Sequence, residues 1–233
     1  MSFRHRVKTS GNPAAVLICR TVRAARRFQL PLLRPVHLPL YHLRSLALLA
    51  YNEAVRVAWW TPLFQARLVR PAPGLHVFSG VPQVIGPLEI EFGRDCSISG
   101  LTTLLGRTAS AGQPRLTVGD NSHIGWQTTI AVGSKVVLGK NVLIAGRGFL
   151  AGYPGHPVDP ARRAAHEPDT NDQVGDIILE DDVWLATGVT VMAGVTIGAG
   201  SIVTAGSVVF RNIPRGVIVT GNPARVVGPV MIP

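Results

Sequence analysis

A repeat of six residues runs through the last third of the chain and most constrains its fold. From residue 179 to residue 214 an aliphatic side chain opens every block of six. An α-helix repeats every 3.6 residues and would scatter these side chains around its axis. Because six is a multiple of two, β-strands keep them all on one side. The opening residues are Leu179, Leu185, Val191, Ile197, Val203 and Val209.

A bend is predicted inside each block. The fourth position holds a residue that tolerates turn conformations, namely Gly188, Gly194, Gly200, Gly206 and Asn212. Alternating short strands and bends predict an all-β solenoid, in which three blocks form one triangular coil and each coil stacks on the next. Consecutive β-hairpins are the alternative, but hairpins do not hold a fixed short period.

The same spacing recurs upstream, with interruptions. Blocks open at Phe92 and Ile98, at Val118 and Ile124 and, after a slip of two residues, at Val132, Leu138, Ile144 and Leu150. The solenoid is therefore predicted from about residue 84 to residue 218, within a domain of residues 81–228 that a tail of residues 229–233 follows. Two interruptions are expected, at residues 104–117 and at residues 151–177.

Residues 1–80 differ from the rest of the chain in charge. They hold eleven Arg, one Lys and a single acidic residue, Glu53, which gives a net charge of +11 against −1 for residues 81–233. This asymmetry predicts a separate N-terminal segment that ends near Pro71–Pro73. Residues 40–60 are expected to form a helix, with Pro31, Pro35 and Pro39 interrupting any helix upstream. No uncharged apolar run is long enough to span a membrane, and no signal peptide is recognised.

Three interpretations of this basic, apolar segment compete. It could lie on an anionic membrane surface, with Arg near the headgroups and with Trp59 and Trp60 at the interface. It could pack on the end of the solenoid as a helical cap. Nucleic-acid binding is disfavoured, because the basic residues alternate with aliphatic ones instead of clustering with polar groups. The first two interpretations are compatible with each other.

The second interruption carries the candidate chemistry. A loop of about 25 residues in a compact solenoid is usually functional, and this one contains His156 between Gly155 and Pro157. A histidine can take a proton from a hydroxyl at neutral pH, although a surface histidine without a role fits the same pattern.

A metal site is not expected, because His123, His156 and His166 lack the close spacing of metal ligands. Cys19 and Cys96 give neither a disulfide framework nor metal spacing.

Three segments resemble the left-handed β-helix, hexapeptide-repeat acyltransferases, closest to the maltose, galactoside and colanic-acid-type O-acetyltransferases. They are HPVDPARR (156–163), DDVWLATGVTVMAGVTIGAGSIVTAGSVV (181–209) and IPRGVIVTGNPARVVG (213–228). The resemblance implies a left-handed parallel β-helix and a homotrimer with active sites between subunits. It also implies that acetyl-coenzyme A is the acyl donor.

The resemblance also assigns roles to residues. His156 would be the general base, and Glu167 would orient the histidine or the acceptor. Five residues would bind the coenzyme: Trp184 beside the site, Thr187 and Ala205 against the pantetheine arm, and Arg211 and Arg225 at the phosphates. The chain departs from the family pattern where Ala186 replaces a glycine and where Phe210 replaces a threonine.

Together these features predict an acetyl-coenzyme A-dependent O-acetyltransferase. The expected acceptor is a sugar hydroxyl of a bacterial surface polysaccharide, lipopolysaccharide or glycolipid precursor. The protein is expected to be cytoplasmic, with peripheral contact to the inner face of the membrane, and to bind neither nucleic acid nor metal. The alternatives are an acyltransferase of the same fold with an amino-sugar or serine acceptor, an inactive solenoid that only binds, and a metal-dependent trimer similar to carbonic anhydrases.

Overall fold

The computed structural model describes residues 13–110 and 112–231 and divides the chain into two compact units, residues 1–49 and 50–233. The first unit contains α2 (Pro13–Arg27) and most of α3 (Arg34–Val55). The division lies earlier in the chain than the boundary predicted near Pro71–Pro73. In the described residues no helix is long and apolar enough to cross a membrane.

The prediction that prolines would interrupt any helix before residue 40 is wrong. Helix α3 begins at Arg34 and contains both Pro35 and Pro39. Pro35 stands in the first turn, where the backbone N–H of any residue lacks an intrahelical partner, so proline loses nothing there. Pro39 removes one hydrogen bond of the second turn, and the helix continues past it to Val55.

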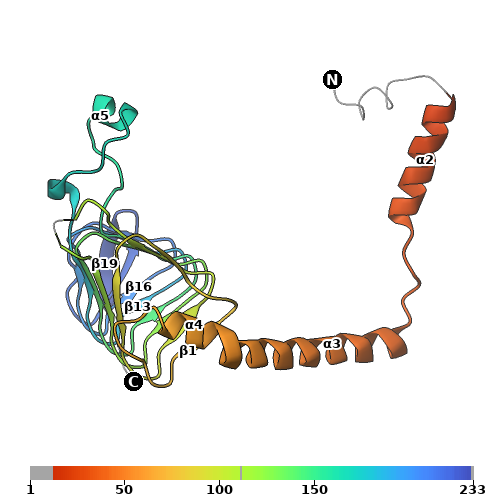
Figure 1. The fold of residues 1–233 in the computed structure, drawn as a ribbon, viewed down its shortest axis with the longest axis horizontal. Helices are drawn as coiled ribbons and strands as arrows, with labels where there is room; N and C mark the ends of the chain where they lie inside the picture. Colours follow the sequence, from red (N-terminus) through yellow and green to blue (C-terminus); the bar gives the residue numbers. More distant parts are fainter. Residues whose placement is uncertain (1–12, 111, 232–233) are drawn as a thin grey trace. The chain divides into compact units, whose positions relative to one another are not determined.

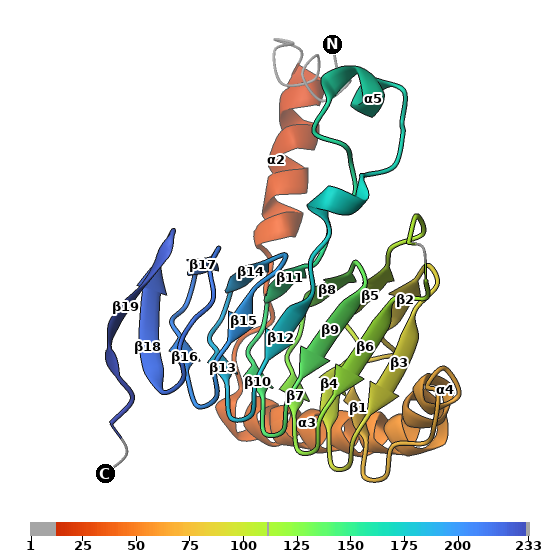
Figure 2. The same cartoon turned by 90° about the vertical axis from the view of Figure 1, so that its left-hand side faces the viewer.

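The second unit contains three sheets that successive strands join in rotation, until the last two strands, which both belong to one sheet (Figures 1 and 2). Sheet A consists of β1 (His76–Phe78), β4 (Ser97–Ser99), β7 (His123–Ile124), β10 (Leu143–Ile144), β13 (Trp184–Leu185), β16 (Ile202–Val203), β18 (Val217–Gly221) and β19 (Ala224–Pro229). Sheet B consists of β2 (Gln83–Ile85), β5 (Thr103–Gly106), β8 (Thr129–Val132), β11 (Phe149–Ala151), β14 (Thr190–Met192) and β17 (Val208–Val209). Sheet C consists of β3 (Glu89–Phe92), β6 (Arg115–Val118), β9 (Lys135–Leu138), β12 (Ile177–Leu179) and β15 (Thr196–Ile197).

The rotation A, B, C means that each coil contributes one strand to each sheet. Within a sheet the pairing is parallel, and Leu185 lies opposite Val203, eighteen residues later. Val191 lies opposite Val209 with the same separation. Three blocks of six therefore make one coil, and the fold is the predicted left-handed parallel β-helix. The one antiparallel pair that the sheets contain is the hairpin of β18 and β19, which ends sheet A.

The opening residues of the blocks form the core. All six from Leu179 to Val209 are fully buried, and the upstream openers, such as Ile124, Ile144 and Leu150, are buried with them. Four of the five predicted bends have the left-handed backbone that favours glycine, with φ between +68° and +79°: Gly188, Gly194, Gly200 and Gly206. The fifth bend differs, because the side-chain oxygen of Asn212 instead accepts a hydrogen bond from the Thr196 N–H at 2.8 Å.

Short helices precede the first coil within the second unit. A turn of π-helix, η1 (Arg56–Trp60), leads into α4 (Thr61–Gln65). Phe64 of α4 is buried and packs edge-on against Phe92 of β3, with ring centroids 5.8 Å apart. Residues 61–65 therefore close the core at the first coil. Regular coiling begins at His76, earlier than the predicted residue 84.

Both predicted interruptions lie where sheet B connects to sheet C, along one edge of the triangular prism, here called the B–C edge. The first is shorter than predicted, because Thr103–Gly106 and Arg115–Val118 are strands and leave a connection of residues 107–114. The second spans residues 152–176 between β11 and β12 and is called the long loop. In Figures 1 and 2 the long loop stands away from the coils and carries α5 (Pro160–Ala164) at its far end.

Candidate active site

The HPVDPARR segment folds into α5 for local reasons. Pro160 occupies the first turn, where its fixed φ suits a helix. The Asp159 carboxylate accepts a hydrogen bond from the Arg162 N–H at 2.8 Å and so caps the helix N-terminus. The Arg163 guanidinium donates to the Pro157 carbonyl at 3.0 Å. These contacts define the turn that directly follows His156.

His156 is exposed and lines an open cavity of about 400 Å³ at the B–C edge. The cavity lies between the long loop and the ends of β2 and β5, and its lining includes Tyr153, Arg107 and Asp169. Burial and, to a smaller extent, the nearby Asp169 carboxylate raise the pKa of the Tyr153 phenol, so the phenol stays protonated around neutral pH. The lining of this cavity thus includes both a histidine ring and a neutral hydroxyl.

Glu167 lines the same cavity but pairs with another residue of the loop. Its carboxylate accepts a hydrogen bond from the Arg162 Nε at 2.6 Å, and both side chains are nearly half exposed. The structure therefore shows an ion pair between Arg162 of α5 and Glu167, which lies after the end of that helix. The role of Glu167 in orienting His156 or the acceptor stays a prediction.

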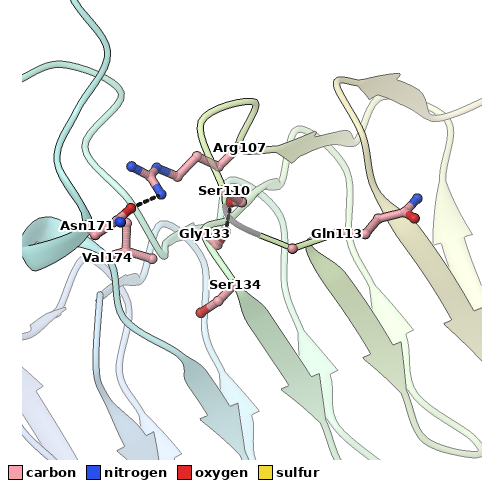
Figure 3. A pocket seen from close by; sticks show the side chains of 8 residues that line it. Arg107, Ser110, Gln113, Gly133, Ser134, Asn171 and Val174 are labelled. Carbon is pink, nitrogen blue, oxygen red and sulfur yellow. Dashed lines mark hydrogen bonds between the residues drawn. The ribbon is translucent and has the colours of Figure 1, made fainter.

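A buried ion pair joins the two connections of the B–C edge. Arg107 and Asp169 are 4% and 6% exposed, and the Arg107 Nε donates to the Asp169 Oδ1 at 2.8 Å. The Arg107 guanidinium also donates to the Asn171 Oδ1 at 2.9 Å. Figure 3 shows this bond at a second cavity of about 350 Å³, which Arg107 and Asn171 also line.

Sequence reasoning missed Arg107, Asp169 and Tyr153. In the sequence Asp169 is one of several acidic residues of the second interruption, and Arg107 stands in a segment to which no role is given. The two residues are 62 positions apart, and no local pattern links them. The available signal was that both stand in interruptions of one solenoid. The two interruptions share an edge because two whole coils, β6–β8 and β9–β11, separate them.

The predicted coenzyme residues lie on the coils after the long loop, all with exposed side chains. Trp184 faces outward from sheet A and is 43% exposed. Thr187 and Ala205 lie one above the other where sheet A turns into sheet B, since the Gly206 N–H donates to the Thr187 carbonyl at 2.9 Å. This second edge is called the A–B edge.

The two predicted phosphate-binding residues are separate from each other. Arg211 follows β17 at the B–C edge, and Arg225 lies on β19 opposite Thr220. The structure therefore brings Thr187 and Ala205 together on one edge and leaves Arg211 on another. Whether these residues bind a coenzyme stays a prediction.

Metal binding has no visible site in the part of the chain that the structure describes. No three side chains of His, Cys, Asp or Glu gather there closely enough to hold a metal ion. His123 has a different environment: its Nδ1 is 2.7 Å from the Ser97 Oγ, and its ring stacks on Phe78 at 5.8 Å. Burial lowers the pKa of His123, which favours the neutral ring.

Comparison with known proteins agrees with the coil geometry. Residues 176–211 match the family described as bacterial transferase hexapeptide (six repeats). The chain carries the transferase hexapeptide repeat. This match covers the stretch in which the period of six is most regular, and it confirms the predicted resemblance to hexapeptide-repeat proteins.

A curated relative extends the match beyond the repeat. The Saccharomyces cerevisiae (strain ATCC 204508 / S288c) protein named Putative acetyltransferase YJL218W is 39% identical over 110 residues, which are 47% of this chain. The chain spans about half, 54%, of that relative's length.

Solved structures share the fold at low sequence identity. A point mutant of AntD, an N-acyltransferase from Bacillus cereus, superposes with a TM-score of 0.57 at 18% identity. The superposition covers 73% of this chain and 89% of AntD. AntD with dTDP and 3-hydroxybutyryl-coenzyme A has the same TM-score at 17% identity, with 73% and 87% of the two chains covered. These similarities support the β-helix architecture.

Proposed function

We propose that this protein is an acyl-coenzyme A-dependent acyltransferase, and more narrowly that it transfers an acetyl group to a sugar hydroxyl with His156 as general base. The observation that carries the proposal is the exposed His156 ring in an open cavity at the edge of a hexapeptide-repeat solenoid. The acetyltransferase name of the yeast relative supports the reaction class. The proposed acceptor is a bacterial surface polysaccharide, lipopolysaccharide or glycolipid precursor.

The proposed reaction needs one base and one set of hydrogen-bond donors. The His156 imidazole accepts the proton of the acceptor hydroxyl while the oxygen attacks the thioester carbonyl of acetyl-coenzyme A. The C–S bond then breaks, the ester forms, and the coenzyme thiolate receives the proton. General-base catalysis of this kind contributes about 10²–10⁴-fold. Backbone N–H groups of neighbouring coils are suited to stabilise the tetrahedral oxyanion.

The proposed coenzyme path follows the small residues of the A–B edge. Thr187 and Ala205 leave room for the thin pantetheine arm, and the Trp184 ring faces outward beside them. Arg211 and Arg225 are exposed, and the guanidinium fork is well suited to coenzyme phosphates. One Arg225 nitrogen, Nη1, donates to the Ala224 carbonyl at 2.9 Å. No metal is proposed for the reaction.

A homotrimer would complete this site. In one protomer His156 belongs to the B–C edge, whereas Thr187 and Ala205 belong to the A–B edge. Two different edges of a prism cannot line one groove, but edges from neighbouring copies can. We therefore propose that the A–B edge of one protomer, with Thr187 and Ala205, faces the His156 loop of its neighbour, as the family resemblance implies.

A second candidate function is acyl transfer to an amine. AntD was solved with dTDP-4-amino-4,6-dideoxyglucose and coenzyme A and is described as an N-acyltransferase. An amino-sugar or serine acceptor would give an amide or a non-glycan ester instead of a sugar ester. Alkaline hydroxylamine cleaves oxygen esters and leaves amides, so it separates ester from amide products. A solenoid that only binds remains the third alternative.

The basic N-terminal unit supports a proposed location at the inner membrane face. In α2, Arg20, Arg23 and Arg27 recur three and four residues apart and share one face, while Ile18 and Val22 lie on another. Each basic residue near an anionic surface contributes about 1 kcal/mol. Replacing the three Arg by Gln in the full chain should weaken binding to anionic vesicles by about 100-fold at low salt.

The control for this test removes the same charge elsewhere. Replacing Arg94, Arg115 and Arg147 by Gln lowers the net charge equally, on the exposed surface of the coils. Equal loss of binding in both triple variants would show attraction by net charge alone and would refute the role of α2. Neutral vesicles should bind neither variant nor the wild type.

The first test of the reaction is acceptor-dependent thiol release from acetyl-coenzyme A, measured over a panel of sugars and glycolipids. His156→Asn should lower release by at least about 100-fold, the low end for a lost general base. His166→Asn is the matched comparison, because His166 lines the same cavity and has φ of +57°, which Asn tolerates. A loss with His166→Asn and none with His156→Asn would move the base to His166. No release with any acceptor or acyl donor would favour the binding-only solenoid.

A further inference from the structure

The Arg107–Asp169 ion pair is unlike the other ion pairs of the described residues. Each of the others leaves both side chains at least 20% exposed, whereas the Arg107 and Asp169 side chains are 4% and 3% exposed. Exposed pairs contribute little, but a buried charge without its partner is strongly unfavourable. The two residues therefore keep each other in place, and neither can leave alone at low cost.

Arg107 is fixed to the coils, and Asp169 is not. Arg107 directly follows β5, and its backbone N–H donates to the Val132 carbonyl of the next coil at 3.0 Å. Asp169 stands within the long loop, which protrudes from the coils (Figure 2). The pair therefore connects a rigid element to a protruding one.

The guanidinium uses its fork geometry. Its Nε donates to the Asp169 Oδ1 at 2.8 Å and its Nη2 to the Asp169 carbonyl at 3.0 Å. Its Nη1 donates to the Asn171 Oδ1 at 2.9 Å (Figure 3). Three donors in one plane thus hold residues 169–171. A lysine, with a single ammonium on a flexible stem, cannot make the same three bonds.

The other carboxylate oxygen reaches the residue before the candidate base. The Asp169 Oδ2 accepts from the Gly155 N–H at 3.4 Å, and His156 follows directly. The ion pair therefore ties the two ends of the excursion that contains α5, residues 155 and 169–171. His156 lies at the base of this excursion, where the tie acts, and Tyr153 and both charged residues line its cavity.

From these contacts we infer that Arg107 is a positioning residue for catalysis: through Asp169 it holds the start of the long loop, and with it His156, against the β-helix. The inference rests on the proposed function for its catalytic consequence, but not for its structural one. Misplacing a catalytic group by about 1 Å can cost about 100-fold in rate. Arg107 and Asp169 both lie in connections outside the strands, so we expect their release to loosen the long loop and to leave the strands folded.

The test compares Arg107→Ala with Arg115→Ala in the full chain. Arg115 is the matched control, because it also pairs with a carboxylate, Glu89, but on the exposed surface of sheet C. Hydrogen exchange is measured peptide by peptide. Amides of residues 152–176 should exchange at least about tenfold faster in Arg107→Ala, while the strands keep their protection. Arg115→Ala should leave the long loop unchanged. Unchanged exchange of the loop in Arg107→Ala would overturn the inference.

Kinetics then separate positioning from simple support of the fold. Arg107→Ala should lower kcat by about 10–100-fold and leave the KM for acetyl-coenzyme A within about threefold. Guanidinium ions added to Arg107→Ala should restore part of the lost kcat. Arg107→Lys, which keeps the charge but not the fork, should have a kcat as low as that of Arg107→Ala. A normal kcat in a variant whose loop exchanges faster would overturn the catalytic consequence.

The two proposals fail in distinguishable ways. If the protein transfers no acyl group at all, the exchange experiment still tests whether the Arg107–Asp169 ion pair holds the long loop in place. If transfer occurs and Arg107→Ala behaves like Arg115→Ala in both exchange and kcat, the proposed function stands and the positioning role does not.

Discussion

Two neighbouring residues of β10 give the sharpest test of the inward and outward alternation. Ile144 is fully buried and lies in register between Ile124 of β7 and Leu185 of β13. Leu143, the residue before it, faces outward and is 41% exposed. Replacing each by Ala removes three carbon atoms in both cases. The two variants therefore differ in burial and hardly at all in composition.

The magnitude follows from burial. Three buried carbons correspond to about 2.4 kcal/mol of transfer free energy, at about 0.8 kcal/mol per methylene. The gap left in a stacked core adds to this, so Ile144→Ala should lower the free energy of unfolding by about 2–5 kcal/mol. Leu143→Ala leaves no enclosed gap and removes a partly exposed side chain, so it should cost about 1 kcal/mol or less.

Urea unfolding followed by circular dichroism measures this difference. The midpoint should shift several times further for Ile144→Ala than for Leu143→Ala, with an unchanged slope in both. A smaller slope for Ile144→Ala would mean that coils on either side unfold separately, as stacked repeats can. Equal destabilisation of the two variants within about 0.5 kcal/mol would refute the assignment of block-opening residues to the core.

Three further predictions concern the coenzyme and pH. Ala205→Phe should raise the KM for acetyl-coenzyme A at least about tenfold by filling the A–B edge, with kcat much less affected. Arg225→Ala should raise the same KM about 10–100-fold, as expected for a lost charged hydrogen bond, and this effect should shrink for a coenzyme without its 3′-phosphate. Because burial lowers the pKa of His123 from about 6.5, the unfolded chain binds more protons below that pH, so stability should fall as pH drops through 6.5. Unfolding midpoints at pH 7.5 and 5.5 check this, and His123→Gln should remove the difference.

The β-helix was predictable because its determinants are local and periodic. Leu185, Val191 and Ile197 each mark the inner face of one short strand, and the glycines mark the bends. The pattern also located the long loop to within a residue or two. It did not locate the start of coiling, because β1 and β2 precede the first regular block.

The candidate site was predictable only in part. His156 could be named from its motif and its place in an interruption. The cavity around His156 could not be predicted, because Arg107 and Asp169 form part of its lining. These two residues come into contact only because the chain completes whole coils between them. Glu167 shows the same limit, since its observed partner is Arg162 of the same loop. Pro39 shows a second limit of sequence reasoning. A proline disfavours a helix, but it does not end a helix that continues for several turns after it.

The coil length of eighteen residues makes insertions of different size act differently on the molecule. Adding one whole coil would displace everything after it by one strand spacing, about 4.8 Å, and keep every side chain over the same sheet. Adding six residues would keep every inward side chain inward, yet turn all that follows by one third of a revolution. A functional group on one edge of the prism would then move to the next edge without any change in the core. Insertions of six residues can therefore change which partner a surface faces, whereas insertions of eighteen residues change only the position of that surface along the axis of the β-helix.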